Sequence, residues 1–262
     1  MNETPDISAY SMILLFLLLI IPVVMGRILR LSITKTLLSA VIRMTVQLFL
    51  VGIYLTYLFR INQPVITLIW LFVMITFASF SVIRNSNLGW RHFYLPVTAA
   101  LVITNVTVLF YFNAFIIRLT DLFEAKFVIA IGGMLLGNAM RGTIIGVNNF
   151  YRDVRRNENR FLFNLSQGAT CFEAGSVHLR RSLIDAIKPS LASMATMGVV
   201  FLPGMMTGQI IGGSSPLVAI EYQIAIMIII FVSTMLTIGL TVLFTMKQSF
   251  DGYGLLKREI FQ

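Results

Sequence analysis

Cysteine and histidine are nearly absent from this sequence, and their scarcity excludes several kinds of chemistry. The 262 residues include one cysteine, Cys171, so the chain has no disulfide framework and no cysteine-based zinc site. Two histidines, His92 and His178, are too few for a histidine-rich metal cage. The sequence also lacks the GxxxxGK[ST] phosphate loop and the HExxH and GxSxG motifs. We therefore expect a chain that is not an enzyme, has no catalytic residues and binds no cofactor of its own.

Charge is scarce as well. Charged residues make up 12% of the chain and hydrophobic residues 57%, with a mean hydropathy of +0.87. A soluble domain of this length does not have such a composition. The net charge of +9 is explained by basic cytoplasmic loops, as the positive-inside rule predicts, and does not require a nucleic-acid partner. The composition predicts a protein integral to the cell (inner or plasma) membrane, in contact with lipid and without nucleic acid.

Apolar runs recur along the chain, and a helix needs about 20 such residues to cross a bilayer. We predict an all-α integral membrane protein with about seven transmembrane helices and a single domain over residues 1–262. The predicted spans lie at about residues 7–25, 37–59, 65–83, 93–117, 127–147, 189–201 and 222–246.

The basic residues predict the orientation of these spans. Fifteen of the 20 Lys and Arg residues fall in alternate loops and the C-terminal tail, whereas Arg60, Arg118 and Lys126 fall in the other loops. Two more, Arg43 and Arg141, lie inside predicted spans. Because cytoplasmic loops carry the excess of Lys and Arg, we expect the N-terminus outside and the C-terminus in the cytoplasm.

The uncharged run over residues 189–220 is too long for one span and is interrupted in its middle. Pro203, Gly204 and Gly208 argue against one straight helix there. Irregular backbone at membrane depth survives only where protein or a water-filled cavity covers it, so such a break could bound a transport pathway. The sequence leaves open whether residues 203–220 form a re-entrant element or a plain external loop.

Polar side chains within the predicted spans are further candidates for a pathway. Arg43 and Gln47 are four residues apart and share one helix face. Either Arg43 reaches the inner headgroups while Gln47 bonds a neighbouring helix, or the pair lines a pathway or a dimer seam. Glu221 borders the membrane near the outer face, where a carboxylate is either functional or simply hydrated.

Glycines and methionines give weaker signals. Gly133 and Gly137 form a GxxxG pair, which favours helix packing over substrate contact for the neighbouring Asn138 and Met140. Thioethers such as those of Met205 and Met206 suit Cu(I), although methionine more often serves as an adaptable packing residue. The identity of any metal ligand stays unknown.

A long polar segment, at about residues 148–188, separates the fifth and sixth predicted spans. Within it we expect a compact elbow over residues 164–181, formed by a short helix, a Gly-Ala-Thr turn and a second helix. Gly168-Ala169-Thr170, followed by Val177 and Leu179, looks like the coupling loop of ABC-transporter permeases. The match is partial, because the acidic residue expected before the glycine is missing and Arg180-Arg181 stand where proline is common.

Five motifs, taken in order, sharpen this resemblance. They are Arg43-x-x-x-Gln47-Leu48, Gly137-Asn138-Ala139-Met140, Ser166-Gln167-Gly168-Ala169-Thr170, Leu202-Pro203-Gly204-Met205-Met206-Thr207-Gly208 and Ala219-Ile220-Glu221-Tyr222-Gln223-Ile224. Together they resemble the FetB-type family of iron-export ABC transporter permeases, which is related to plant aluminium-tolerance membrane proteins. The resemblance extends over about residues 37–246.

The resemblance implies a permease subunit of an ATP-driven exporter that moves iron, another metal cation or its complex out of the cytoplasm. It implies a homodimer with two copies of a separate ABC ATP-binding subunit, which uses ATP and Mg²⁺. The residues expected to couple to that subunit are Ser166, Gln167, Gly168, Ala169 and Thr170. The residues expected along the substrate pathway are Arg43, Gln47, Asn138, Met140, Pro203, Gly204, Met205, Met206 and Glu221.

Two alternatives remain at the level of the sequence. The apolar, methionine-rich lining would also suit a permease for a small organic or lipid-like solute. A seven-helix receptor or membrane scaffold without a transport cycle is the rival from another class.

Overall fold

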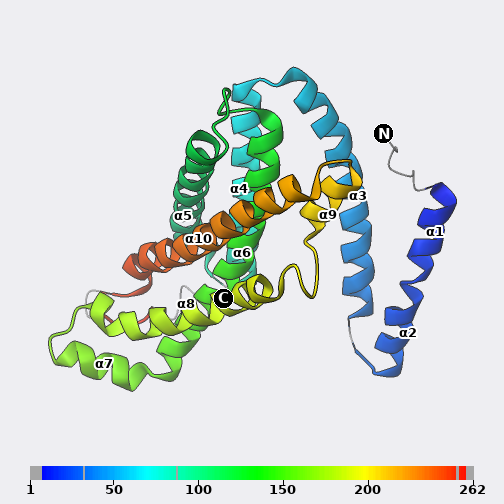
Figure 1. The fold of residues 1–262 in the computed structure, drawn as a ribbon. Coiled ribbons are helices and arrows are strands. Elements are labelled where there is room, and N and C mark those ends of the chain that lie inside the picture. Colours follow the sequence, from blue (N-terminus) through cyan, green and yellow to red (C-terminus); the bar gives the residue numbers. More distant parts are fainter. Residues whose placement is uncertain (1–7, 32, 87, 252–253, 258–262) are drawn as a thin grey trace.

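The computed structural model describes residues 8–31, 33–86, 88–251 and 254–257, and helices dominate its architecture (Figure 1). In chain order the helices are α1 (Ala9–Leu17), α2 (Ile20–Ile28), α3 (Thr34–Ile61), α4 (Pro64–Asn85), α5 (Trp90–Tyr111), the short π-helix η1 (Phe112–Ile116), α6 (Ala125–Arg156), α7 (Glu158–Ser166), α8 (Cys171–Thr196), α9 (Gly204–Ile211) and α10 (Pro216–Ser249).

Within the described residues, six helical stretches are long and apolar enough to cross a membrane. They are Tyr10–Ile28, Thr34–Ile61, Pro64–Asn85, Trp90–Ile116, Ala125–Arg156 and Pro216–Ser249. Each overlaps one of the seven predicted spans, so the all-helical membrane fold is confirmed.

The prediction of a seventh span, at residues 189–201, is corrected. That region belongs to α8, which begins at Cys171 and ends at Thr196. The helix is long enough to span but not apolar enough, because it carries five charged residues. They are Glu173, Arg180, Arg181, Asp185 and Lys188.

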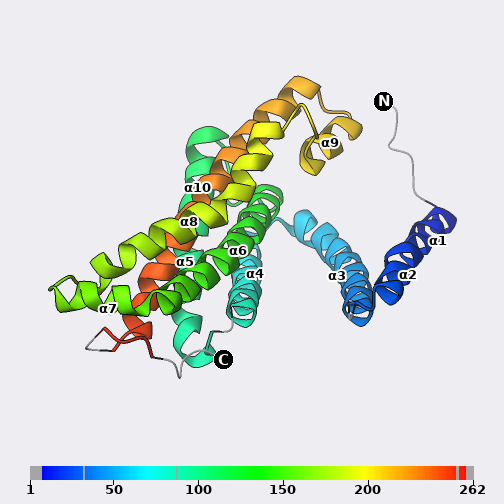
Figure 2. The ribbon, with the colours of Figure 1, turned by 90° about the horizontal axis from the view of Figure 1, so that it is seen from below.

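Helix α8 nevertheless runs back along the bundle, in the direction opposite to α6 and α10. Gly146 of α6 packs against Ile238 of α10, and Gly142 packs one turn earlier on each helix against Thr234. Residue numbers rise together along both helices, so α6 and α10 run parallel. The chain between them therefore has to come back, and α8 lies against both helices on the way (Figure 2).

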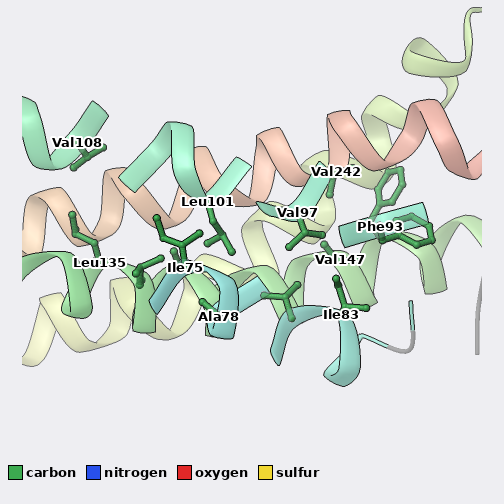
Figure 3. Close-up of a cluster of buried hydrophobic side chains, with 14 of the residues drawn as sticks. Ile75, Ala78, Ile83, Phe93, Val97, Leu101, Val108, Leu135, Val147 and Val242 are labelled. Carbon is green, nitrogen blue, oxygen red and sulfur yellow. The ribbon is translucent and has the colours of Figure 1, made fainter. Parts of the chain in front are cut away.

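The core lies among α4, α5, α6 and α10, where buried aliphatic and aromatic side chains interdigitate (Figure 3). Ile75, Val97, Leu101, Leu135 and Val242 are each at most 2% exposed. Lipid tails are as apolar as these side chains, so close packing rather than escape from water holds such helices together. Packing is closest between α6 and α10, where a Cβ added to Gly142 would overlap Thr234 and one added to Gly146 would lie 2.5 Å from the side chain of Ile238.

Hydroxyl side chains along α10 face the same core. They are Ser233, Thr234, Thr237, Thr241, Thr245 and Ser249, all buried. Several bond to a backbone carbonyl one turn earlier, as Thr237 does to Ser233 at 2.7 Å. Near the end of the helix, the hydroxyls of Ser249 and Tyr151 of α6 lie 2.6 Å apart. Such bonds satisfy polar groups where water is excluded and tie α10 to α6.

Helices α1, α2 and α3 form an arm that stands apart from the bundle (Figures 1 and 2). The joint is Asn62, which ends α3 in a left-handed conformation with φ of 44°. Its side-chain oxygen accepts a hydrogen bond of 3.0 Å from the backbone N–H of Ala125, at the start of α6. Beside this joint the rings of Tyr54 and Trp70 pack 4.3 Å apart. The remaining length of α3 leaves most of its side chains exposed within one chain.

Candidate functional site

The structure confirms the elbow as a helix–turn–helix. Helix α7 ends at Ser166 and α8 begins at Cys171. Gly168 turns the chain with φ of +90°, a conformation that side-chain-bearing residues rarely adopt. The N–H of Ala169 donates to the carbonyl oxygen of Asn164 at 3.1 Å, which closes the last turn of α7. The five residues predicted to couple, 166–170, thus form the tip of the elbow.

A capping box fixes the start of α8. The N–H of Glu173 donates to the hydroxyl of Thr170 at 3.2 Å, and the N–H of Thr170 donates to the carboxylate of Glu173 at 2.7 Å. The backbone N–H of Thr170, and then its hydroxyl, lower the pKa of Glu173 because both stabilise the charged carboxylate. The turn is therefore specified by its own side chains.

Two aromatic side chains are exposed on the elbow, one on each side of the turn. Phe163 on α7 is 62% exposed and Phe172 on α8 is 53% exposed. Nearby, Phe161 points the other way and stacks on Phe250, with ring centroids 5.1 Å apart. Large apolar side chains exposed on a polar segment are typical of a surface that binds another protein.

The elbow is anchored to α6 by a polar contact. Nδ1 of the buried His178 on α8 lies 2.6 Å from a carboxylate oxygen of Asp153 on α6. The same oxygen is 3.7 Å from the guanidinium of Arg181. The other carboxylate oxygen accepts from the amide of Asn157 at 2.8 Å. Asp153 therefore connects three neighbouring polar groups where α6, α7 and α8 meet.

The uncharged run is interrupted, as predicted, but α8 already ends at Thr196 rather than near residue 201. Gly198 has φ of +84°, and residues 197–203 lead to Pro203, whose extended backbone precedes the eight-residue helix α9. Met206 is buried and Met205 packs partly buried against the core. Helix α9 lies against α10. The break is therefore a short helix between two turns.

The structure does not bring the predicted pathway residues together within one chain. Arg43 and Gln47 lie exposed on α3, in the arm that stands apart from the bundle. Met140 and Asn138 are half-buried on α6, and Glu221 is exposed in the second turn of α10.

One residue that the site prediction omitted is Arg141 of α6. Its Nε donates to the carbonyl oxygen of Gly137 at 3.2 Å, and a terminal nitrogen donates to the side-chain oxygen of Asn138 at 3.3 Å. Asn138 in turn donates to the carbonyl oxygen of Met134 at 2.8 Å. The sequence signal was a charge inside an apolar run, which is rare and often functional.

The glycine prediction is corrected in part. A Cβ added to Gly133 would lie 3.0 Å from Met74, so this glycine does allow close packing. A Cβ added to Gly137 would have no neighbouring heavy atom of the described chain within 4 Å, apart from the backbone of its own helix. The tightest helix contact on α6 instead uses Gly142 and Gly146, another GxxxG pair in the same helix.

In the part of the chain that the structure describes, no three His, Cys, Asp or Glu side chains gather closely enough to hold a metal ion.

These features define a polytopic integral membrane protein of the permease-like type, with six apolar spans and a helix–turn–helix elbow beside them. A family model described as uncharacterised protein family UPF0014 matches residues 9–250, and the chain belongs to this family.

Relatives agree with this assignment. UPF0014 membrane protein YjkA of Bacillus subtilis is 30% identical over 97% of this chain and 99% of its own. The probable iron export permease protein FetB of Escherichia coli is 29% identical over 84% of both chains. The protein ALUMINUM SENSITIVE 3 of Arabidopsis thaliana is 32% identical over 75% of this chain and 71% of its own. The resemblance to the FetB-type family is therefore confirmed. No solved structure matches the chain.

Proposed function

We propose that this chain is the membrane-embedded permease subunit of an ATP-driven ABC exporter. It acts as a homodimer with two copies of a separate ATP-binding subunit and moves iron or another metal, as an ion or a complex, out of the cytoplasm. Membership of UPF0014 and similarity to a protein named as an iron export permease support this proposal.

The observation that carries the proposal is the elbow. Its turn is specified by Gly168 and by the capping box of Thr170 with Glu173, so it keeps its shape without a partner. Phe163 and Phe172 project from it and are exposed. A rigid protrusion with two exposed aromatic anchors suits docking into a groove on an ATP-binding subunit.

Helix α8 gives the elbow a mechanical connection to the rest of the molecule. The helix has 26 residues, so it extends about 39 Å from the elbow to the break before α9. Along that length His178 contacts Asp153 of α6, and Gly175 lies against Met246 of α10. A push on the elbow would therefore shift α8 against the two longest helices of the bundle and alternate access to the pathway.

The exposed polar side chains at membrane depth support a dimer. Arg43, Gln47 and Arg141 lie on faces that no other part of the described chain covers fully. An arginine that faces lipid inside the hydrocarbon core is costly, by about 2.5–3.5 kcal/mol at the centre and less toward the interface. A second copy placed over these faces would remove that cost and enclose a polar path between the two chains.

Co-purification with the ATP-binding subunit tests the proposal. The subunit that copurifies with the chain is identified by mass spectrometry and then coexpressed with variants of the elbow. We expect Gly168→Asp and the double variant Phe163→Ala/Phe172→Ala to lose the subunit. Phe77→Ala is the matched control, because Phe77 is 71% exposed but lies on α4, away from the elbow.

Retention of the subunit by both elbow variants, with the control unchanged, would contradict the docking proposal. Size-exclusion chromatography of each variant in detergent shows that the membrane fold itself is intact. If the chain were instead a receptor or scaffold without a transport cycle, copurification would not depend on the elbow.

A further inference from the structure

Arg141 lies inside the apolar stretch of α6, six residues before the end of the span predicted at residues 127–147. It is 11 residues from Arg152 and 15 residues from Lys126, the charged residues toward the two ends of α6. At 1.5 Å per residue these separations are about 16 and 22 Å. The side chain of Arg141 is turned away from the nearer end of that span, because its guanidinium bonds to Gly137 and Asn138 on the preceding turn.

Two hydrogen bonds orient the guanidinium of Arg141, but neither acceptor carries a negative charge that would neutralise it. Two of its five N–H groups are used, by the carbonyl of Gly137 and the amide oxygen of Asn138. Both acceptors are uncharged, and the residue is exposed. The open space around Gly137, one turn away, leaves room for a ligand to approach the remaining N–H groups.

The acidic side chains on α6, and on the described helices packed against it, lie away from Arg141 along the helix axis. On α8, Asp185 lines one pocket with Asn149 and Arg152, which lie eight and eleven residues beyond Arg141 on α6, and it pairs with Lys188 at 2.7 Å. Within the described membrane-spanning helices the carboxylates are Asp153 and Glu221. Asp153 is 12 residues further along α6, about 18 Å, and is engaged by His178. The contact between Gly142 and Thr234 places Arg141 level with Ser233, and Glu221 is 12 residues from Ser233 along α10, again about 18 Å.

A second copy would not supply the missing acid either. The usual dimer is twofold symmetric, and in one membrane with a common orientation its axis lies along the membrane normal. Such an axis keeps every residue at its own depth. Asp153 and Glu221 of the second copy would therefore be as far above or below Arg141 as those of the first.

We propose that Arg141 binds the carboxylate or phosphate oxygens of an anionic cargo. This inference rests on the proposed permease function and names its substrate class. A dimer would present two guanidinium groups at the same depth, and Arg43 adds positive charge on α3. A bare metal cation would be repelled there, whereas arginine binds planar carboxylates and phosphates through paired hydrogen bonds. Iron would accordingly travel as a negatively charged chelate.

Binding to the purified chain in lipid nanodiscs, without an ATP-binding subunit, tests this inference. The probes are Fe(III)-citrate, citrate alone, inorganic phosphate, Fe(II) and Zn(II), measured by equilibrium dialysis. Fe(III)-citrate against free citrate or phosphate separates a metal chelate from a metal-free organic or phosphate anion. The variants are Arg141→Gln and Arg141→Lys, with Arg91→Gln as control, since Arg91 is exposed at the start of α5 outside the apolar core.

We expect saturable binding of at least one anion, weakened about tenfold or more by Arg141→Gln, as loss of a charged hydrogen-bond donor implies. Arg141→Lys should retain part of the binding and Arg91→Gln all of it. Saturable binding of Fe(II) or Zn(II) alone, or anion binding unchanged by Arg141→Gln, would overturn the inference. So would a lack of saturable binding by every anion. The docking of the ATP-binding subunit is measured separately, so the permease proposal can stand when the cargo inference fails.

Discussion

Nδ1 of His178 and a carboxylate oxygen of Asp153 lie 2.6 Å apart. This contact joins α8, which begins at the elbow, to α6, which carries Arg141. His178 is buried, and Asp153 also contacts Arg181 and Asn157. The contact lies between the surface proposed to dock an ATP-binding subunit and the group proposed to bind cargo. It is the polar link through which movement of α8 would reach α6.

Loss of this link should cost stability. Asp153→Ala leaves the buried His178 without its carboxylate, and we expect a loss of about 1–3 kcal/mol in the free energy of unfolding. Asp185→Ala is the control, because Asp185 pairs with the exposed Lys188 on the same helix and should change stability by less than about 0.5 kcal/mol. Thermal unfolding in detergent measures both. Equal shifts in Tm would contradict the anchoring role of Asp153.

The glycines of α6 should differ in their tolerance of a methyl group. Gly146→Ala places a Cβ 2.5 Å from Ile238, so α6 and α10 must separate, at a cost of about 1–3 kcal/mol. Gly137→Ala has open space around it and should be neutral or stabilising by up to about 1 kcal/mol. The comparison is made by thermal unfolding of the two variants. A larger loss for Gly137→Ala would mean that a contact outside this chain uses that glycine.

The elbow should depend on pH through Glu173. Its pKa is lowered in the folded chain, so the capping contribution is complete above the unfolded pKa, about 4.3, and is lost as the pH falls through the folded value. We expect hydrogen-exchange protection at the start of α8, corrected for intrinsic rates, to be constant near neutral pH and to fall in acid. Glu173→Ala should show, at every pH, the low protection that the wild-type chain shows in acid. Wild-type protection that persists at pH 2 would argue against the capping box as its source.

The break before α9 should matter for transport rather than for assembly. Pro203→Ala combined with Met205→Ala relaxes the extended residue that precedes α9 and removes a partly buried thioether. We expect ATP-dependent transport into inside-out vesicles to fall several-fold while the ATP-binding subunit still copurifies. Normal transport by this double variant would show that residues 203–208 only connect α8 to α10 and have no role in transport.

Local patterns predicted much of this structure because they act within a few residues. The elbow follows from a glycine that permits the turn and a threonine that caps the next helix. A break in the uncharged run was predicted from Pro203 and its neighbouring glycines, although α8 already ends at Thr196 and the chain turns at Gly198. Both features are specified by short stretches of the chain, and both were visible in the sequence.

Features that depend on distant contacts were harder to predict. Gly133 with Gly137, and Gly142 with Gly146, are the same motif in one helix, and only the position of α10 shows which pair is in closest contact. The seventh span was expected from an uncharged run, but the helix there starts much earlier and includes charged residues. Arg141 became a candidate only once its lack of a reachable carboxylate could be seen in three dimensions.

ATP hydrolysis by the chain reconstituted with its ATP-binding subunit is the most direct test of the central claim. The complex is titrated with Fe(III)-citrate, Fe(II), Cu(I), Zn(II) and Al(III), and the same titration is repeated with Gly168→Asp. The account predicts severalfold stimulation by a metal species in the wild-type complex and none in the variant. An active complex that responds to no metal, or equal stimulation of Gly168→Asp, would contradict it.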